Sequence, residues 1–150
     1  MNKKEMLINT FGTDKPIIAL LHMDPLPGDP LYRNTTSVAK IVDNVKKDVS
    51  NLVEGGVDAI LFSNEFSMPY ENHVSQVTTA SMAYIIGQVV NELPIPFGVH
   101  VISDGMATVE LAAATGAKFV RGIFTGAYVG ECGLKNTDIA AVLRRKNELG

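Results

Sequence analysis

Residues 17–32 of this chain, IIALLHMDPLPGDPLY, decide between the folds that its pattern allows. Five apolar residues form a short run that is typical of a buried strand in a parallel sheet. The run ends at His22, and three prolines, a glycine and two aspartates follow within the next eight residues. The stretch therefore predicts a strand that opens into a stiff loop, in place of the G-x-G-x-x-G turn of a Rossmann nucleotide site.

Downstream of this loop, apolar strand-like runs alternate with helical patterns. The sequence predicts strands over 17–21, 58–63, 97–102 and 118–124, and helices over 38–53, 76–92, 106–115 and 137–149. The first of these helices carries Val38, Ile41, Val42 and Val45 at the i, i+3, i+4, i+7 spacing of one helical face. Thr36 or Ser37 is its predicted N-cap, and Gly55-Gly56 ends it.

Four units of strand and helix predict an α/β fold with a parallel sheet, either an open doubly wound sheet or a TIM-type (β/α)8 barrel. The long proline-rich loop favours the barrel, because barrels keep their active sites in the loops at the carboxyl ends of their strands. A barrel needs about 250 residues. We therefore expect residues 1–150 to be the truncated N-terminal half of a single barrel domain. The alternative is a half-barrel that closes by pairing with another copy.

Composition excludes several classes of protein. Thirteen basic and sixteen acidic residues leave a net charge of −3, and no basic run points to nucleic acid as a partner. The start MNKKEMLINTF lacks the apolar region of a secretory signal, and no apolar run is long enough to span a bilayer. The single cysteine, Cys132, excludes an internal disulfide, predicts a cytoplasmic protein and is read as an unreactive loop thiol.

Polar residues gather where the predicted strands end, which in a barrel is the side of the active site. The candidates are His22 after the first strand, Asn64 and Glu65 after the second, His100, Ser103 and Asp104 in and after the third, and Arg121 and Thr125 in and after the fourth. We predict catalytic roles for Glu65, Asp104 and His22. We predict substrate-binding roles for Asn64, His100, Ser103, Arg121 and Thr125.

The chemistry of these side chains is limited. Glu65 or Asp104 is a candidate general acid or base, supported by His22 or His100. Each residue also has a structural interpretation: His22 could bond a backbone carbonyl, and Asp104 could cap the next helix. Arg121 interrupts an apolar run and, if buried, needs an anionic partner such as a carboxylate or a ligand phosphate. No H-E-x-x-H or similar spacing is present, so we predict no metal, and no cofactor is identified.

Four segments resemble the BtpA family. They are HMDPLPGDPLY (22–32), which fits the form H-x-x-P-L-P-G-x-P, GGVDAILFSNEFSMPY (55–70), IPFGVHVISD (95–104) and TGAKFVRGIFTGAYVGECG (115–133). The resemblance implies a TIM-type barrel related to the ribulose-phosphate-binding barrels, with members longer than 150 residues. His100 departs from the family pattern, which commonly has an asparagine there.

The resemblance implies two functions. The first is an enzyme acting on a small phosphorylated or glycosidic metabolite, as a nucleosidase-like hydrolase, because some bacterial members are associated with carbohydrate-related genes and labelled nucleosidases. The second is a non-catalytic accessory or assembly factor of the photosystem I biogenesis type. We favour the enzyme, since the sequence has no chlorophyll-binding or membrane-anchoring feature. The expected partners are a small-molecule substrate and, in the half-barrel case, further copies of the chain.

Overall fold

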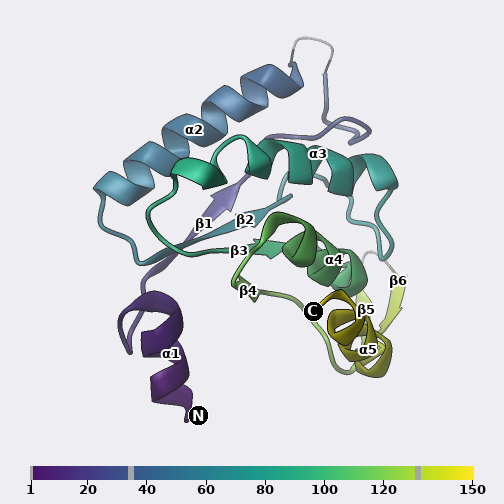
Figure 1. Ribbon diagram of the computed structural model, residues 1–150. Helices are drawn as coiled ribbons and strands as arrows, with labels where there is room; N and C mark the ends of the chain where they lie inside the picture. The colour runs from purple at the N-terminus through teal and green to yellow at the C-terminus, as the bar shows by residue number, and fades with distance from the viewer. Residues whose placement is uncertain (1, 34–35, 131–132) are drawn as a thin grey trace.

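The computed structural model describes residues 2–33, 36–130 and 133–150, so Cys132 lies outside the described residues. Strands and helices alternate along the chain (Figure 1). In order, the elements are α1 (Lys3–Phe11), β1 (Ile18–His22), α2 (Val38–Glu54), β2 (Ala59–Ser63), α3 (Gln76–Gly87), the 3-10 helix η1 (Val90–Glu92), β3 (Phe97–His100), α4 (Gly105–Thr115), β4 (Phe119–Val120), β5 (Ala127–Gly130), β6 (Gly133–Asn136) and α5 (Ile139–Leu149).

The central sheet has the order β1-β2-β3-β4, and every neighbouring pair is parallel. This confirms the predicted α/β class and the parallel sheet. The order never reverses, whereas a doubly wound sheet reverses its strand order at a switch point. Four successive units of a (β/α)8 barrel have this sequential order. The closed barrel itself stays a prediction.

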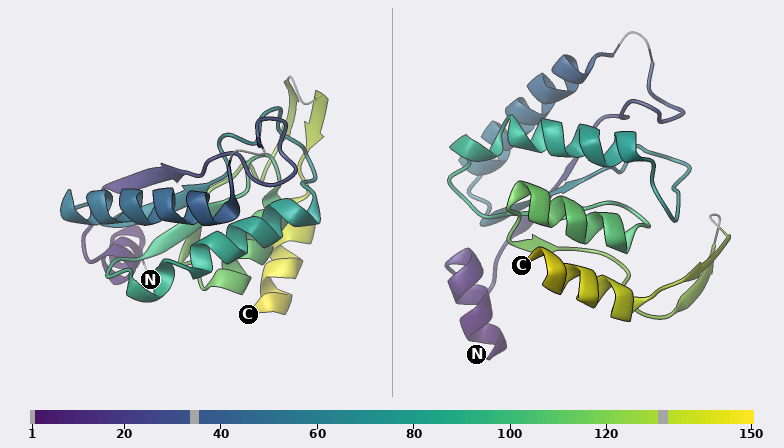
Figure 2. Two further views of the ribbon diagram at one scale, coloured as in Figure 1. Left: turned by 90° about the horizontal axis from the view of Figure 1, so that it is seen from above. Right: turned by 45° about the vertical axis from the view of Figure 1, so that its right-hand side comes forward.

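Helices α2, α3 and α4 lie in a row on one side of the sheet (Figures 1 and 2). Leu21, Phe62 and Val99 are paired across three strands and are all buried in the core on that side. Because side chains alternate along a strand, the residues between them face the other way. On β1 these are Ile18 and Leu20, which are 37% and 48% exposed. The sheet therefore has one face covered by α2, α3 and α4 and a second face that these helices do not cover, here called the uncovered face. On the inner strand β2, Ala59 and Leu61 of this second face are nevertheless buried.

Helix α1 was not predicted, although its start carries a recognisable signal. The Asn2 side chain accepts from the Glu5 N–H, and the Glu5 carboxylate accepts from the Asn2 N–H, which is a capping box. At the other end of the helix, the Phe11 and Phe119 rings meet edge to face with centroids 5.2 Å apart. This contact places α1 against β4, apart from the row of helices (Figure 1).

The structure shortens two predicted elements and adds a third. The helix predicted over 76–92 ends at Gly87, and a separate 3-10 turn, η1, follows. The strand predicted over 118–124 pairs with β3 only over Phe119–Val120. The glycine-rich segment that follows, predicted as a loop, forms the antiparallel hairpin β5–β6.

The helix caps agree with the sequence. Ser37 is the N-cap of α2 and accepts from the Lys40 N–H, as one of the two predicted alternatives. Asp104 and Asp138 cap α4 and α5 through hydrogen bonds from Ala107 and Ala141. None of the helices in the described part of the chain is both long and apolar enough to cross a membrane.

Candidate functional site

A row of polar side chains crosses the uncovered face at the carboxyl ends of the strands. His22 on β1 pairs with Ser63 on β2, and Ser63 pairs with His100 on β3. Neighbouring strands lie about 4.8 Å apart, so the two imidazoles flank Ser63 within one row. Arg121 continues the row beyond β4, where its N–H donates to the Val99 carbonyl. Sequence reasoning identified His22, His100 and Arg121 but not the register that aligns them.

Glu65 reaches this row from the loop after β2. Its Oε2 lies 3.9 Å from His22 Nε2, and both side chains are partly exposed, at 40% and 35%. The Tyr70 hydroxyl lies 2.9 Å from the Glu65 carbonyl and 3.4 Å from Glu65 Oε1. Tyr70 therefore holds both the backbone and the carboxylate of Glu65. The sequence analysis did not single out Tyr70, whose only signal is its place in the same loop.

His100 lies among charges of both signs. Its pKa falls from 6.5 to about 4, first because burial penalises the imidazolium and then because of the positive charge of Arg121. Lys135 lowers this pKa further, while Glu65 acts in the opposite direction. His100 is therefore neutral at pH 7, and its buried Nδ1 has no hydrogen-bond partner among the described residues. We call His22, Ser63, Glu65, His100, Arg121 and Lys135 the strand-end cluster.

Two cations in the cluster differ from expectation. Arg121 was considered as a residue that needs an anionic partner if buried, and among the described residues its side chain is exposed. Lys135 was not predicted. It lies on β6, and its Nζ donates to the Ser103 carbonyl, so the hairpin returns to the carboxyl end of β3. Sequence distance hides this contact, because 32 residues separate Ser103 from Lys135.

Asn64 and Asp104 have structural contacts. Asn64 is 1% exposed, and its Oδ1 accepts from the Ile102 N–H at 2.8 Å, which ties the end of β2 to the segment after β3. Asp104 is 7% exposed. Its Oδ1 accepts from Ala107 N at 2.9 Å and its Oδ2 from Val74 N at 3.0 Å, so it caps α4 and holds the loop before α3. These hydrogen bonds do not test the predicted chemical roles, but they show that both side chains stabilise the loops around the strand ends.

Ser103 and Thr125 lie at the edge of the cluster. Ser103 has a φ of +65°, a left-handed conformation unusual for a residue other than glycine, and its carbonyl faces Lys135. Thr125 is exposed, and its carbonyl accepts from the Tyr128 hydroxyl at 3.0 Å. The structure therefore gives Ser103 and Thr125 backbone contacts with the hairpin, and no described contact joins the Thr125 hydroxyl to the cluster.

The proline-rich loop after β1 is fixed by carboxylates. Asp29 Oδ2 accepts from Leu26 N at 2.6 Å and from the Ser67 hydroxyl at 2.7 Å, which joins the loops after β1 and β2. Asp24 accepts from Asn44 of α2 at 2.7 Å. These bonds join the proline-rich loop to α2 and to the loop after β2. Among residues 2–33, 36–130 and 133–150, no three His, Cys, Asp or Glu side chains are grouped closely enough to hold a metal.

Comparisons with known proteins all indicate the same family. The sequence pattern of the BtpA family matches residues 13–150. The chain is 45% identical to the sgc region protein SgcQ of Escherichia coli over 96% of its own length and 54% of that protein. It is 38% identical to an uncharacterised protein of Pyrococcus abyssi, over 75% of this chain and 43% of the relative. It is 28% identical to the photosystem I biogenesis protein BtpA of Synechocystis, over 95% and 50%.

The chain thus spans about half the length of the curated relatives it matches. No solved structure matches it significantly. The family pattern covers the first strand, the loop that holds His22 and every residue of the strand-end cluster. On this coverage, and on the 45% identity to SgcQ, the chain belongs to the BtpA family.

Proposed function

We propose that this protein is a hydrolase acting on a small phosphorylated or glycosidic metabolite, with nucleosidase-like chemistry at the strand-end cluster. The observation that supports this proposal is that the Glu65 carboxylate lies 3.9 Å from His22 Nε2. Both residues belong to the strand-end cluster, which also contains His100. A carboxylate next to an imidazole is a common acid and base pair in hydrolysis.

In the proposed reaction, Glu65 acts as general base toward water. The water oxygen bonds to the anomeric carbon while Glu65 takes up a water proton, and the bond from that carbon to the leaving group breaks. The leaving group departs with the bonding electrons and takes a proton from solvent, while His22, 3.9 Å from the carboxylate, orients Glu65. The sugar gains hydroxyl, the leaving group gains hydrogen, and no oxidant is needed. Asp104, which caps α4, has a positioning role in this scheme.

The other cluster residues bind in this proposal. With a pKa of about 4, His100 is a neutral imidazole near pH 7 and is suited to a hydrogen bond with a substrate hydroxyl. Arg121 and Lys135, whose positive charges both act on His100, supply cations for an anionic group such as a phosphate. Asn64, Ser103 and Thr125 line the surrounding loops.

We also propose that the four units form half of a (β/α)8 barrel whose interior is the uncovered face. The sequential strand order and the single row of helices support this arrangement. In a closed barrel Ile18 and Leu20 are packed by opposing strands. Relatives of about twice this length have room for the remaining units.

A non-catalytic assembly factor is the alternative. The name of the Synechocystis relative, photosystem I biogenesis protein, favours it. In that case the strand-end cluster is a ligand site without turnover. The two proposals differ in one measurable property, the release of product from a small substrate.

The test is product release from nucleosides and sugar phosphates, followed by chromatography of the free base or sugar. We compare the unaltered chain with Glu65→Gln, and with Glu92→Gln as a matched control, because Glu92 is an exposed glutamate of η1. Loss of a general base costs about 10²–10⁴-fold in rate. We expect Glu65→Gln to lose at least a hundredfold and Glu92→Gln to keep its rate. Equal turnover by all three proteins contradicts the assignment of Glu65, and saturable binding of a substrate without turnover supports the alternative.

A further inference from the structure

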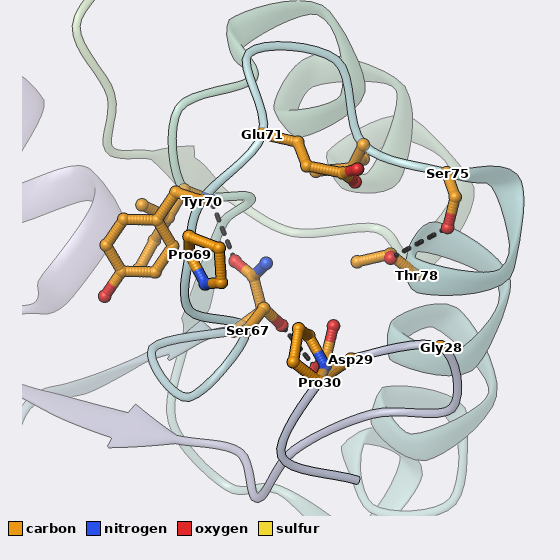
Figure 3. Close-up of a pocket in the computed structure, with 12 residues that line it drawn as sticks. Gly28, Asp29, Pro30, Ser67, Pro69, Tyr70, Glu71, Ser75 and Thr78 are labelled. Carbon is orange, nitrogen blue, oxygen red and sulfur yellow. Dashed lines mark hydrogen bonds between the residues drawn. The ribbon is translucent and has the colours of Figure 1, made fainter. Parts of the chain in front are cut away.

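A cavity lies on the helix-covered side of the loops that surround the strand-end cluster. It has a volume of about 300 Å³, at the small end of ligand pockets, and it opens between the loop after β1, the loop after β2 and the first turn of α3 (Figure 3). Its lining includes Asp29, Asn64, Ser67, Glu71 and Thr78. Except for Asn64, the proposed function assigns none of these residues.

Three of the lining side chains are polar and at least nine-tenths buried. Asn64, Ser67 and Thr78 are 1%, 9% and 4% exposed. Asn64 accepts from the Ile102 N–H through Oδ1, which leaves its amide nitrogen as the donor that it can offer to the cavity. Buried polar groups are costly unless they are hydrogen-bonded. A lining with this much buried polarity suits a ligand that itself carries donors and acceptors.

The hydroxyl groups of the cavity are held in place. Ser67 Oγ donates to Asp29 Oδ2 at 2.7 Å, and Ser75 Oγ lies 3.2 Å from Thr78 Oγ1 (Figure 3). Ser75 is the N-cap of α3 but makes no capping hydrogen bond from its side chain. The Thr78 N–H instead donates to the Ser75 carbonyl at 3.1 Å, so Ser75 and Thr78 are joined through both backbone and side chain at the amino end of α3.

The charges around the cavity oppose a charged ligand of either sign. Asp29 and Glu71 are carboxylates, and the lining residues include no lysine, arginine or histidine, so an anion is repelled. A cation finds little charge to pair with, because Asp29 already accepts hydrogen bonds from Leu26 N and Ser67 Oγ and because water screens the exposed Glu71. The field that remains suits a neutral molecule with many hydrogen-bonding groups.

We propose that this cavity binds an uncharged, polyhydroxylated ligand of monosaccharide size. The hydroxyls of such a molecule can donate to Asp29 and Glu71 and accept from Asn64, while Pro30 and Pro69 offer apolar contact. The inference does not depend on the hydrolase proposal. The cavity adjoins the strand-end cluster through Asn64, which precedes Glu65, and through Tyr70, which lines the cavity and contacts Glu65.

The test is a binding titration with no turnover readout. Isotope-labelled chain is titrated with D-ribose and D-galactose, and the backbone amide shifts of Gly28, Ser67 and Thr78 are followed by NMR. Inorganic phosphate and choline serve as an anionic and a cationic probe. We expect saturable shifts with at least one sugar, confined to the residues around the cavity, and no such shifts with phosphate or choline.

Two adjacent threonines of α3 provide a matched pair. Thr78 lines the cavity, whereas Thr79 does not and bonds the Gln76 carbonyl. A hydrogen bond is worth about 1 kcal/mol, which corresponds to roughly fivefold in affinity. We expect Thr78→Val to weaken sugar binding by about fivefold and Thr79→Val to leave it unchanged.

Glu71→Gln tests the same site if the Thr78→Val variant does not fold. Glu71 is exposed, so its substitution is not expected to affect folding. We expect weaker sugar binding in this variant as well. The proposal is overturned if no sugar produces saturable shifts, if phosphate or choline produces them instead, or if the cavity variants bind as the unaltered chain does. None of these outcomes bears on whether Glu65 supports turnover.

Discussion

Burial and neighbouring charges together determine the pKa of His100. Desolvation lowers its pKa first, Arg121 and Lys135 lower it further, and Glu65 opposes them, with a result of about 4. An imidazole that stays neutral through the physiological range can bind a hydroxyl, but it is a poor proton donor at pH 7. This is why the proposed reaction assigns proton transfer to Glu65 and a binding role to His100.

The lowered pKa predicts a loss of stability in acid. Above pH 6.5 His100 is neutral in both the folded and the unfolded chain, so it adds no pH dependence. As the pH falls from 6.5 toward 4, the unfolded chain takes up a proton that the folded chain does not, so the free energy of unfolding decreases. After allowance for solvent screening of this half-exposed group, we expect His100→Gln to remove about 1 kcal/mol of this decrease.

Urea unfolding at several pH values measures the stability effect, and an NMR titration of the His100 ring measures the pKa itself. We expect a midpoint near 4 in the titration. A midpoint at the ordinary value of 6.5 would mean that the site is more hydrated than the structure indicates.

Gly98 is required by a close approach between strands. A Cβ at this position would lie 2.5 Å from the Phe119 ring and 2.7 Å from the Phe119 carbonyl. The carbonyl belongs to the paired strand and cannot move aside without loss of the β3–β4 ladder. We expect Gly98→Ala to lower the free energy of unfolding by about 2–3 kcal/mol. Gly87→Ala is the control, because nothing lies within 4 Å of its Cβ, and it should be neutral or stabilising. Equal stability of the two variants in urea would disprove the close contact.

At the scale of elements, Asp104 connects two segments that are distant in sequence. One carboxylate oxygen caps α4, and the other accepts from Val74 in the loop before α3. The hairpin β5–β6 makes a comparable connection, since it carries Lys135 back to the carboxyl end of β3. The loops around the strand-end cluster are therefore held by hydrogen bonds to neighbouring elements.

A comparison of two N-cap residues measures how much the hydrogen bond from Val74 N to Asp104 adds to stability. Asp138 caps α5 through a single bond to Ala141 and is exposed, whereas Asp104 is buried and makes two such bonds. Loss of an N-cap costs about 1 kcal/mol, and a buried donor left unpaired costs about 1–3 kcal/mol. We expect Asp104→Ala to lower the free energy of unfolding by about 2–4 kcal/mol and Asp138→Ala by about 1 kcal/mol. Similar losses in chemical denaturation would show that the Val74 contact adds nothing.

At the scale of the whole molecule, the uncovered face is the main unsatisfied surface. Ile18 and Leu20 of β1 are 37% and 48% exposed on this face, although they belong to an apolar strand. Contiguous apolar surface of this kind favours association. The α/β unit described here therefore gains from a cover on this face, and a second copy of the chain can supply one.

We expect the 150-residue chain to associate in solution, with a mass above 16.1 kDa that rises with concentration in light scattering. Leu20→Lys places a charge on the uncovered face and should reduce the mass toward that of the monomer. Tyr84→Lys is the matched control, because Tyr84 is 56% exposed on the outer helix α3. A stable monomer with cooperative unfolding would contradict this expectation, as would equal effects of the two substitutions.

The sequence predicted most of the local structure because local rules decide it. Periodicity located α2 and α4 to within a residue or two, and Ser37 and Asp104 cap these helices as their residue types allow. It missed α1, whose Asn2–Glu5 capping box is a readable signal. It also missed the hairpin β5–β6, because glycines there suggested a loop and a two-stranded ribbon has little buried pattern to reveal it.

For the site, the sequence by itself determined which polar residues follow each strand, because strand ends and turn residues are local features. Only the tertiary structure decided which of them meet. Strand register aligned His22, Ser63 and His100, and the hairpin brought in Lys135 across 32 residues. The tertiary structure also showed that Arg121 is exposed among the described residues. Register, exposure and long-range contact depend on how elements pack together, and no single segment encodes them.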